Sequence, residues 1–313
     1  MKERKLYLLL AIILIISLIS TGCIWSINPI NKIIYKTYNL DESNSFSYSS
    51  IESIEIEASV KEVNIAPTQA DEFMVTLTGT LTANYEPKLI VENSGDSVTI
   101  KTQETMHNMK IDKNELILGI EVPEKYINDI KCTTISGLIS TESLTLEELN
   151  LSAVSGSIFM NNITSDSLEL SSVSGDLNLN SVNANNANLN TTSGKTDIYN
   201  FSGTEVDSTS VSGSINFSGQ ADEIDLSSTS GDLDLNLDNL RGNIDMSTVS
   251  GDVAIRIGGD PDYRLSFKTV SGDFNSNADL SIEKITNRNV TAERGNGTYQ
   301  ITVSTTSGSL NIN

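Results

Sequence analysis

The chain has 313 residues, of which 38% are hydrophobic and only 5% aromatic, and its 41 acidic and 20 basic residues give a net charge of −21. This length is ample for one large core. So negative a field repels nucleic acid, which excludes nucleic-acid partners and favours solubility or cation binding.

The N-terminus predicts attachment to a membrane. A charged start at residues 1–5 precedes the apolar stretch 6–19, which is typical of a secretory signal. The following Ser-Thr-Gly-Cys resembles the lipobox of prokaryotic lipoproteins, in which the cysteine, here Cys23, is lipidated and becomes the new N-terminus. The alternative is an uncleaved anchor, because residues 6–27 are long enough to cross a bilayer with Trp25 near one interface. Either way residues 1–22 act as signal peptide or anchor, and the remainder is extracytoplasmic, tethered through a lipid or a helix.

The segments that follow lack a constant period. Without residues 1–22 the chain keeps 17 basic and 40 acidic residues, a net charge of −23. Residues 23–47 are predicted to be a tether. Residues 48–123 alternate apolar and polar side chains without regular spacing, which predicts an irregular N-terminal β region covering the first regular repeat.

Residues 124–313 are predicted to be repeats marked by Ser-Gly dipeptides. The glycines of these corners are Gly137, Gly156, Gly175, Gly194, Gly213, Gly231, Gly251, Gly272 and Gly308. The first eight lie 18 to 21 residues apart and the last follows after 36. A period near 19–20 residues indicates stacked units that cannot bury their apolar faces alone.

Aligning the repeats on the glycine predicts two strands in each. Apolar residues fill the positions seven and five before the glycine and two and four after it, as in Leu168, Leu170, Leu177 and Leu179. Such alternation is typical of strands. A small residue three before the glycine suits a tight bend, and glycine tolerates the backbone angles of such a bend. A further apolar column seven after the glycine suggests a third side.

The fold predicted from these columns is all-β. Stacking each column on itself gives a parallel β-solenoid of about nine or more rungs, where a rung is one repeat, with about 4.8 Å between rungs. Crossover connections favour a right-handed β-helix. Residues 280–298 interrupt the period, as either a degenerate rung or a side loop. The chain then ends at Asn313 directly after a strand, which predicts an uncapped edge and end-to-end self-association.

The repeats also resemble a known family. Residues 118–125 (LGIEVPEK), the serial Val-Ser-Gly-Asp blocks at 173–176, 249–252 and 270–273, and the ending 297–310 are similar to the putative adhesin family of prokaryotic β-strand-repeat proteins. The resemblance covers roughly residues 50–313 and implies a domain of unknown function on secreted or membrane-attached proteins, with adhesion or a link to envelope stress. It implies no catalytic residues.

Candidates for chemistry are few. Asp232, Asp252 and Asp273 follow the glycine on what the sequence order makes successive rungs, so they are candidates for a Ca²⁺ site or a glycosidase pair. Turn residues held by local hydrogen bonds are the favoured interpretation. Cys132 occupies an apolar column and His107 is a lone histidine, so neither predicts catalysis. We therefore predict no catalytic residue, no enzyme activity and no cofactor, with Ca²⁺ the one alternative.

Outward hydroxyls form a column four residues before the glycine. They are Thr133, Ser152, Ser171, Thr209, Ser227, Ser247 and Ser304. These hydroxyls form either a face that binds a glycan or an ordinary β surface. The sequence thus predicts a tethered, non-enzymatic adhesin that binds a surface glycan or an envelope protein. The alternatives are an envelope-stress scaffold that contacts a membrane protein or itself, and, third, a polysaccharide-active enzyme.

Overall fold

The computed structural model describes residues 34–103, 109–286 and 288–313. Residues 35–313 form one compact unit, and every regular element in the described part is a strand. No described residue belongs to a helix long and apolar enough to cross a membrane. The predicted signal or anchor at 1–22, Cys23 and His107 lie outside the described residues.

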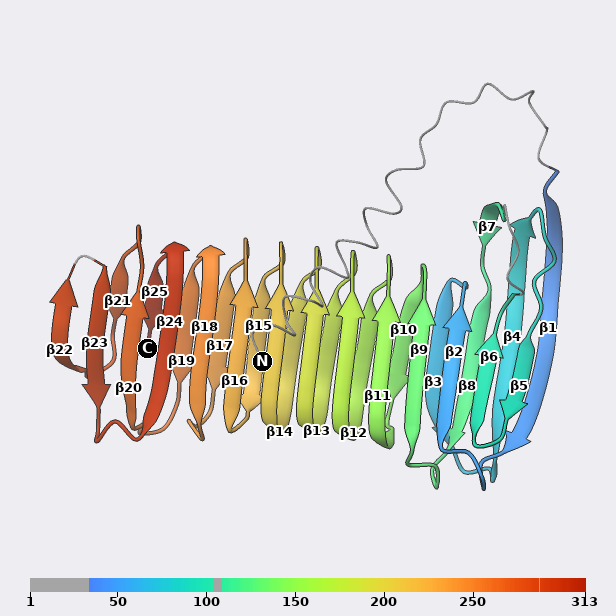
Figure 1. The fold of residues 1–313 in the computed structure, drawn as a ribbon, viewed down its shortest axis with the longest axis horizontal. Coiled ribbons are helices and arrows are strands. Elements are labelled where there is room, and N and C mark those ends of the chain that lie inside the picture. Colours follow the sequence, from blue (N-terminus) through green and yellow to red (C-terminus); the bar gives the residue numbers. More distant parts are fainter. Residues whose placement is uncertain (1–33, 104–108, 287) are drawn as a thin grey trace. The chain divides into compact units, whose positions relative to one another are not determined.

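Parallel ladders form the body of the molecule (Figure 1). Strands that lead into the Ser-Gly corners are β9 (Asp129–Thr134), β11 (Thr145–Ala153), β16 (Glu223–Ser228) and β18 (Asn243–Ser250). Strands that leave them are β10 (Leu138–Glu142), β15 (Ile215–Gln220), β17 (Leu233–Leu237) and β19 (Val253–Ile257). Three long strands, β12 (Ile158–Ser172), β13 (Leu177–Thr191) and β14 (Thr196–Ser210), run from one corner to the next.

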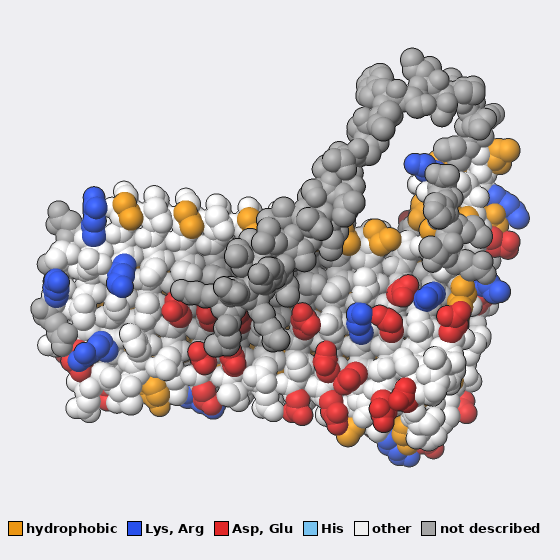
Figure 2. Space-filling view, viewed as in Figure 1, with side chains coloured by type: hydrophobic (Ala, Val, Ile, Leu, Met, Phe, Trp, Pro, Cys, Tyr) orange, Lys and Arg blue, Asp and Glu red, His pale blue; other side chains and the backbone are white. Residues whose placement is uncertain are grey.

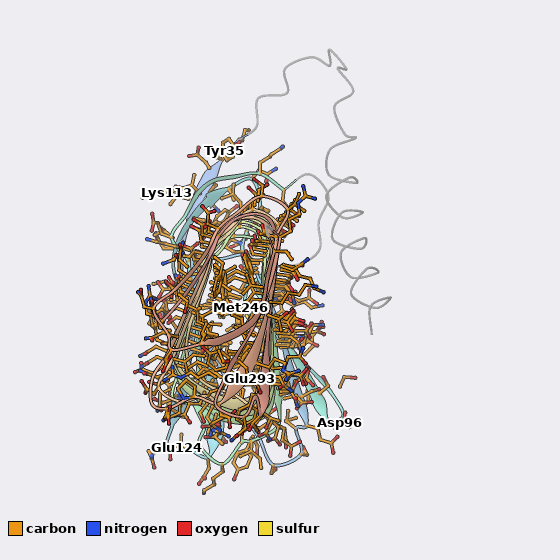
Figure 3. The ribbon with its side chains drawn as sticks, turned by 90° about the vertical axis from the view of Figure 1, so that its left-hand side faces the viewer. Tyr35, Asp96, Lys113, Glu124, Met246 and Glu293 are labelled. Carbon is orange, nitrogen blue, oxygen red and sulfur yellow. The ribbon has the colours of Figure 1, made fainter. Side chains whose placement is uncertain are left out.

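In the register of these ladders, residues from the same predicted column pair with one another on adjacent strands. Leu151 pairs with Leu170, which pairs in turn with Leu189, and all three are buried. The apolar columns therefore face a continuous core between the sheets, seen end-on around Met246 in Figure 3. The all-β, solenoid-like fold predicted from the columns is confirmed.

Four repeats have the predicted third side, and in each of them the chain bends at a residue with a left-handed backbone conformation. Ser143, Asn162, Ser181 and Asn200 have φ between 54° and 56°, each six residues after a corner glycine. The residues that follow them are buried: Leu144, Ile163, Val182 and Phe201.

The N-terminal region is more regular than predicted. Strands β2 (Ser53–Ala58) and β3 (Glu62–Thr68) pair in parallel with β9 and β10. Ile54 lies opposite Ile130, and Val63 lies opposite Ile139, so they occupy the repeat columns without a Ser-Gly mark. Parallel strands β6 (Ser97–Lys101) and β8 (Ile117–Pro123) extend the ladders beyond them.

Antiparallel strands close this end of the ladders. They are β1 (Lys36–Ser47), β4 (Glu72–Ala83), β5 (Ile90–Ser94) and β7 (Ile111–Asn114). The predicted tether over 23–47 is therefore too long, because residues 36–47 pair with β4 along their whole length. Phe46 stacks on Phe73 across this pair, with ring centroids 4.9 Å apart, which supplies a packing reason for the strand.

The C-terminal end corrects the predicted chain order. Its strands are β20 (Tyr263–Lys268), β21 (Phe274–Ser276), β22 (Ser281–Thr286), β23 (Asn289–Arg294), β24 (Tyr299–Ser307) and β25 (Leu310–Ile312). Strand β24 pairs with β18 on one side and β20 on the other, and β25 likewise lies between β19 and β21. The last rung is thus inserted between two earlier ones, and the predicted uncapped edge at Asn313 is wrong. Residues 280–298 contain the antiparallel hairpin β22–β23, which covers β20.

Candidate functional site

The Ser-Gly corners are built by close approach of neighbouring backbones. A β-carbon at each corner glycine from Gly156 onward would overlap the carbonyl oxygen of the corner glycine in the adjacent rung. Of the nine glycines only Gly137 has a φ in the left-handed range, at 133°. The prediction that glycine is needed for its backbone angles is therefore wrong for the other eight. At those eight positions glycine is needed because the adjacent rung leaves no room for a β-carbon.

In several bends the small residue on the inside ties adjacent rungs together. The buried hydroxyl of Ser172 donates to the carbonyl oxygen of Gly156 at 3.0 Å, and that of Ser228 to Gly213 at 3.1 Å. Thr248 donates to Gly231 at 3.2 Å in the same way. Burial of these polar groups is acceptable because each finds a partner.

The acidic candidates next to the corner have structural partners. Asp232 Oδ1 accepts the backbone N–H of Asp252 at 2.8 Å, and Asp252 Oδ1 accepts that of Ser309 at 2.7 Å. Ser309 Oγ in turn accepts the N–H of Asp273 at 3.2 Å. Because Ser309 lies between them, Asp252 and Asp273 are not on successive rungs, as the sequence order predicted. Within the described ranges no three His, Cys, Asp or Glu side chains gather to hold a metal ion.

The hydroxyl column forms one continuous row on the outer face of the strands that lead into the corners. Register pairs Thr133 with Ser152 and Ser152 with Ser171, and continues through Asn190 to Ser304. Side chains bond along the row, with Ser152 Oγ 2.7 Å from Ser171 Oγ and Thr209 Oγ1 3.1 Å from Ser227 Oγ. The row offers a hydroxyl at each of its steps except Asn190, which presents an amide.

Sequence reasoning missed a partly exposed aliphatic column two residues before the glycine. We call it the corner ridge; its aliphatic members are Ile135, Val154, Val173, Val211, Val249 and Val270. Ile135 and Val270 are each 59% exposed, Val249 51% and Val154 41%. Orange side chains along the upper edge of Figure 2 follow this column. The signal was present, since a β-branched residue fills this position in every repeat.

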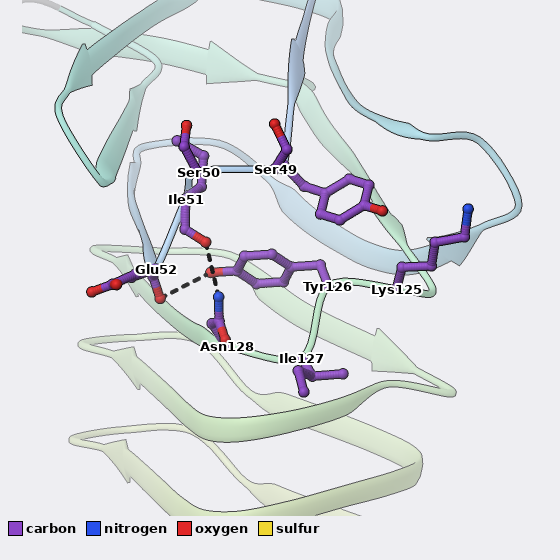
Figure 4. Close-up of a pocket in the computed structure, with 9 residues that line it drawn as sticks. Ser49, Ser50, Ile51, Glu52, Lys125, Tyr126, Ile127 and Asn128 are labelled. Carbon is purple, nitrogen blue, oxygen red and sulfur yellow. Dashed lines mark hydrogen bonds between the residues drawn. The ribbon is translucent and has the colours of Figure 1, made fainter.

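A pocket of about 310 Å³ lies where the N-terminal strands meet the first rungs (Figure 4). Tyr126 lies in its wall, and its hydroxyl donates to the carbonyl oxygens of Asp129 at 2.8 Å and Glu52 at 3.3 Å. Burial raises the pKa of this phenol above its usual range. Asn128 also bonds inward, to the carbonyl oxygen of Ile51 at 2.9 Å. These groups hold the loop together.

Cys132 is buried, and that burial raises the pKa of its thiol to about 12. A neutral buried thiol is a poor nucleophile, which agrees with its place in an apolar column.

The comparison with protein families identifies the architecture. A family described as Toastrack DUF4097 matches residues 51–313. The chain belongs to this family. The match spans the whole ladder from β2 to β25 and bears out the predicted resemblance to a domain of unknown function associated with putative adhesins.

One solved structure shows the same fold at low identity, and others are more distantly similar. A putative adhesin from Parabacteroides merdae has a TM-score of 0.50 and 11% identity, covering 87% of this chain and 96% of that one. A putative adhesin from Bacteroides fragilis has a TM-score of 0.43 and 13% identity, covering 89% and 97%. A putative lipid binding protein from Parabacteroides distasonis has a TM-score of 0.45 and 14% identity, covering 87% and 96%. No curated protein matches the chain.

Proposed function

We propose that the chain is a membrane-tethered, extracytoplasmic β-helix that acts as a non-enzymatic adhesin for repetitive glycans of a cell envelope or cell surface. The tether is the lipidated Cys23 or an uncleaved N-terminal helix. A right-handed winding and about nine or more rungs remain part of this proposal. Two of the three similar structures are named putative adhesins and the third a putative lipid binding protein, and the likeness concerns the fold.

The observation that carries the proposal is the hydroxyl row. It presents a hydroxyl at every step of the ladder from β9 to β24 except at Asn190, where an amide takes its place. A polysaccharide repeats its own hydroxyls along an extended chain, so weak contacts add through multivalency. The Ser-Gly corners fix the row to a rigid backbone, which lowers the entropy cost of binding.

The test titrates fluorescently labelled residues 35–313 onto intact cells and purified envelope polysaccharide, with and without Ca²⁺. We expect saturable binding that free polysaccharide competes away. The double variant Ser171→Ala/Ser227→Ala removes two hydroxyls of the row and should weaken binding about thirtyfold, because each net hydrogen bond contributes about 1 kcal/mol.

The matched control is Asn178→Ala/Asn236→Ala on the opposite sheet, which should bind like the unmodified protein. Equal weakening by both double variants, or no binding to any surface, contradicts the adhesin and favours an envelope scaffold. Loss of binding in chelator would assign a role to Ca²⁺ and the Asp232–Asp252 column. Polysaccharide turnover abolished by changing those carboxylates would instead identify an enzyme.

A further inference from the structure

We infer that the corner ridge faces the lipid bilayer, so that the molecule lies along the membrane with its aliphatic corners against the lipid surface. This inference rests on the proposed membrane tether. It adds an orientation and a second contact surface, separate from the hydroxyl row.

The first support is the place where the described chain begins. Strand β1 runs antiparallel to β4, and β4 runs antiparallel to β8. Strand β8 starts level with the corners, because Ile117 pairs with Glu62, which pairs with Leu138 directly after Gly137. The first residues of β1 therefore extend past the ridge. The corners lie at the upper edge of Figure 1, and Tyr35 lies at the same upper end in Figure 3.

The second support is the length of the predicted tether. Cys23 precedes Tyr35 by 12 residues, and a chain of this length spans at most about 40 Å. A bilayer that holds Cys23 or residues 6–27 therefore stays within about 40 Å of the N-terminal end of the ridge edge. Tethering at this distance raises the effective concentration of lipid surface at the ridge, so contacts too weak for a free protein become significant.

The third support is the distribution of charge between the two edges. The edge opposite the ridge carries a run of carboxylates: Glu147, Glu148, Asp166, Glu205, Asp222 and Glu223. Figure 2 shows such acidic side chains in the lower half of the visible face. The ridge side also carries carboxylates, at Asp176, Asp232, Asp252 and Asp273, but there Lys36, Lys113, Lys195 and Lys268 offset them, so the charge is more balanced. A protein of net charge −23 approaches a lipid surface at lowest cost with its acidic edge turned away.

The ridge itself is suited to shallow contact. Its backbone is held rigid, since the Ser155 N–H donates to the Ile135 carbonyl at 2.9 Å and the Ser174 N–H to that of Val154 at 3.0 Å. Asp176, Asp232 and Asp252 lie just beyond the corner, and each carboxylate accepts a backbone N–H of the next rung. The aliphatic tips project between these groups, where they can enter the boundary between headgroups and acyl chains.

The test places a fluorescent reporter on each edge of residues 35–313, which form a compact unit. A polyhistidine tag at Tyr35 attaches the protein to phosphatidylcholine vesicles containing a nickel-chelating lipid and a nitroxide-labelled acyl chain. One variant carries an environment-sensitive dye at Ser250→Cys on the ridge; its matched control carries the dye at Thr204→Cys on the opposite edge. Cys132 is buried and stays unlabelled. We expect the ridge dye to be quenched about threefold more than the control dye.

The variant Ile135→Thr/Val154→Thr/Val249→Thr/Val270→Thr should abolish the difference while vesicle attachment persists. It should fold, because Thr192, Thr229 and Thr306 occupy the same column. Equal quenching at both edges, or stronger quenching at Thr204→Cys, overturns the inference. So does ridge quenching that appears only at high protein density, which would indicate a second copy on the ridge. The titration with purified polysaccharide contains no lipid and the nickel lipid replaces the native tether, so either proposal can fail independently of the other.

Discussion

At the scale of single residues, the corner glycines are set by the distance between rungs. A methyl group at Gly213 would overlap the carbonyl oxygen of Gly194, so Gly213→Ala forces adjacent rungs apart. We expect a loss of about 1–3 kcal/mol in the free energy of unfolding, measured by urea denaturation. The neighbouring Ser212→Ala, at an exposed position beside the ridge residue Val211, should change stability by less than about 0.5 kcal/mol. Equal losses in the two variants would contradict the steric explanation.

Left-handed residues at the third side give a prediction of opposite sign. Ser181 has a φ of 56°, a conformation that costs a side-chain-bearing residue about 1 kcal/mol. Ser181→Gly should therefore raise the free energy of unfolding by about 0.5–1 kcal/mol, measured by thermal and urea denaturation. Ser202→Gly in an extended part of β14 should lower it by a similar amount, because glycine loses more entropy on folding. Destabilisation by both changes would rule out the backbone argument.

At the scale of elements, the sequence predicted the strands better than their neighbours in space. Periodic apolar columns determine which residues face the core, so Leu151, Leu170 and Leu189 were placed correctly. Similar rungs can pair in parallel in any order, so the sequence does not specify which rungs are neighbours in space. The insertion of β24 between β18 and β20 could therefore not be predicted. The first rung was missed because Lys61, between β2 and β3, stands where later repeats have glycine.

The loop that returns the chain to β24 depends on one carboxylate. Asp262 accepts the backbone N–H groups of Thr298 and Asn296, both at 2.9 Å, and the Thr298 hydroxyl at 3.0 Å. Hydrogen bonds, first from the Thr298 backbone, lower the pKa of Asp262 below its usual value. The stabilisation is therefore present above the unfolded-state pKa, about 3.9, and is lost as pH falls through the lower folded-state pKa.

Asp262→Ala should consequently lower the urea midpoint at pH 7 and increase hydrogen exchange in β24. The difference from the unmodified protein should close as the pH falls below about 4. Asp260→Ala is the matched control, because Asp260 is fully exposed and its ion pair with Arg294 is long, at 3.5 Å. A difference between Asp262→Ala and the unmodified protein that persists undiminished at low pH would show that charge on Asp262 is not the cause.

At the scale of the whole molecule, the surface columns were visible in the sequence but their exposure was not. The hydroxyl row followed from strand alternation, since outward positions on a half-buried strand are polar. The corner ridge breaks that rule. Val249, near the end of β18, and Val270, in the bend after β20, are both aliphatic and exposed. Exposure at a corner depends on its geometry, which periodicity alone does not specify.

The acidic surface should make stability depend on salt through pairs of like charge on adjacent strands. Glu205 and Glu223 lie directly opposite each other on β14 and β16, and Glu223 lies opposite Asn243 on β18. Like charges in this position destabilise a sheet by about 0.2–1 kcal/mol, and salt screens them.

Glu223→Gln should therefore raise the free energy of unfolding at low ionic strength. Asn243→Asp should lower it while keeping the oxygen that accepts the Gln300 N–H. Urea denaturation at about 10 mM and 1 M NaCl tests both, because the two effects should nearly vanish in high salt. Effects that do not depend on salt would show that packing of these side chains, rather than repulsion between like charges, determines their contribution to the free energy of unfolding.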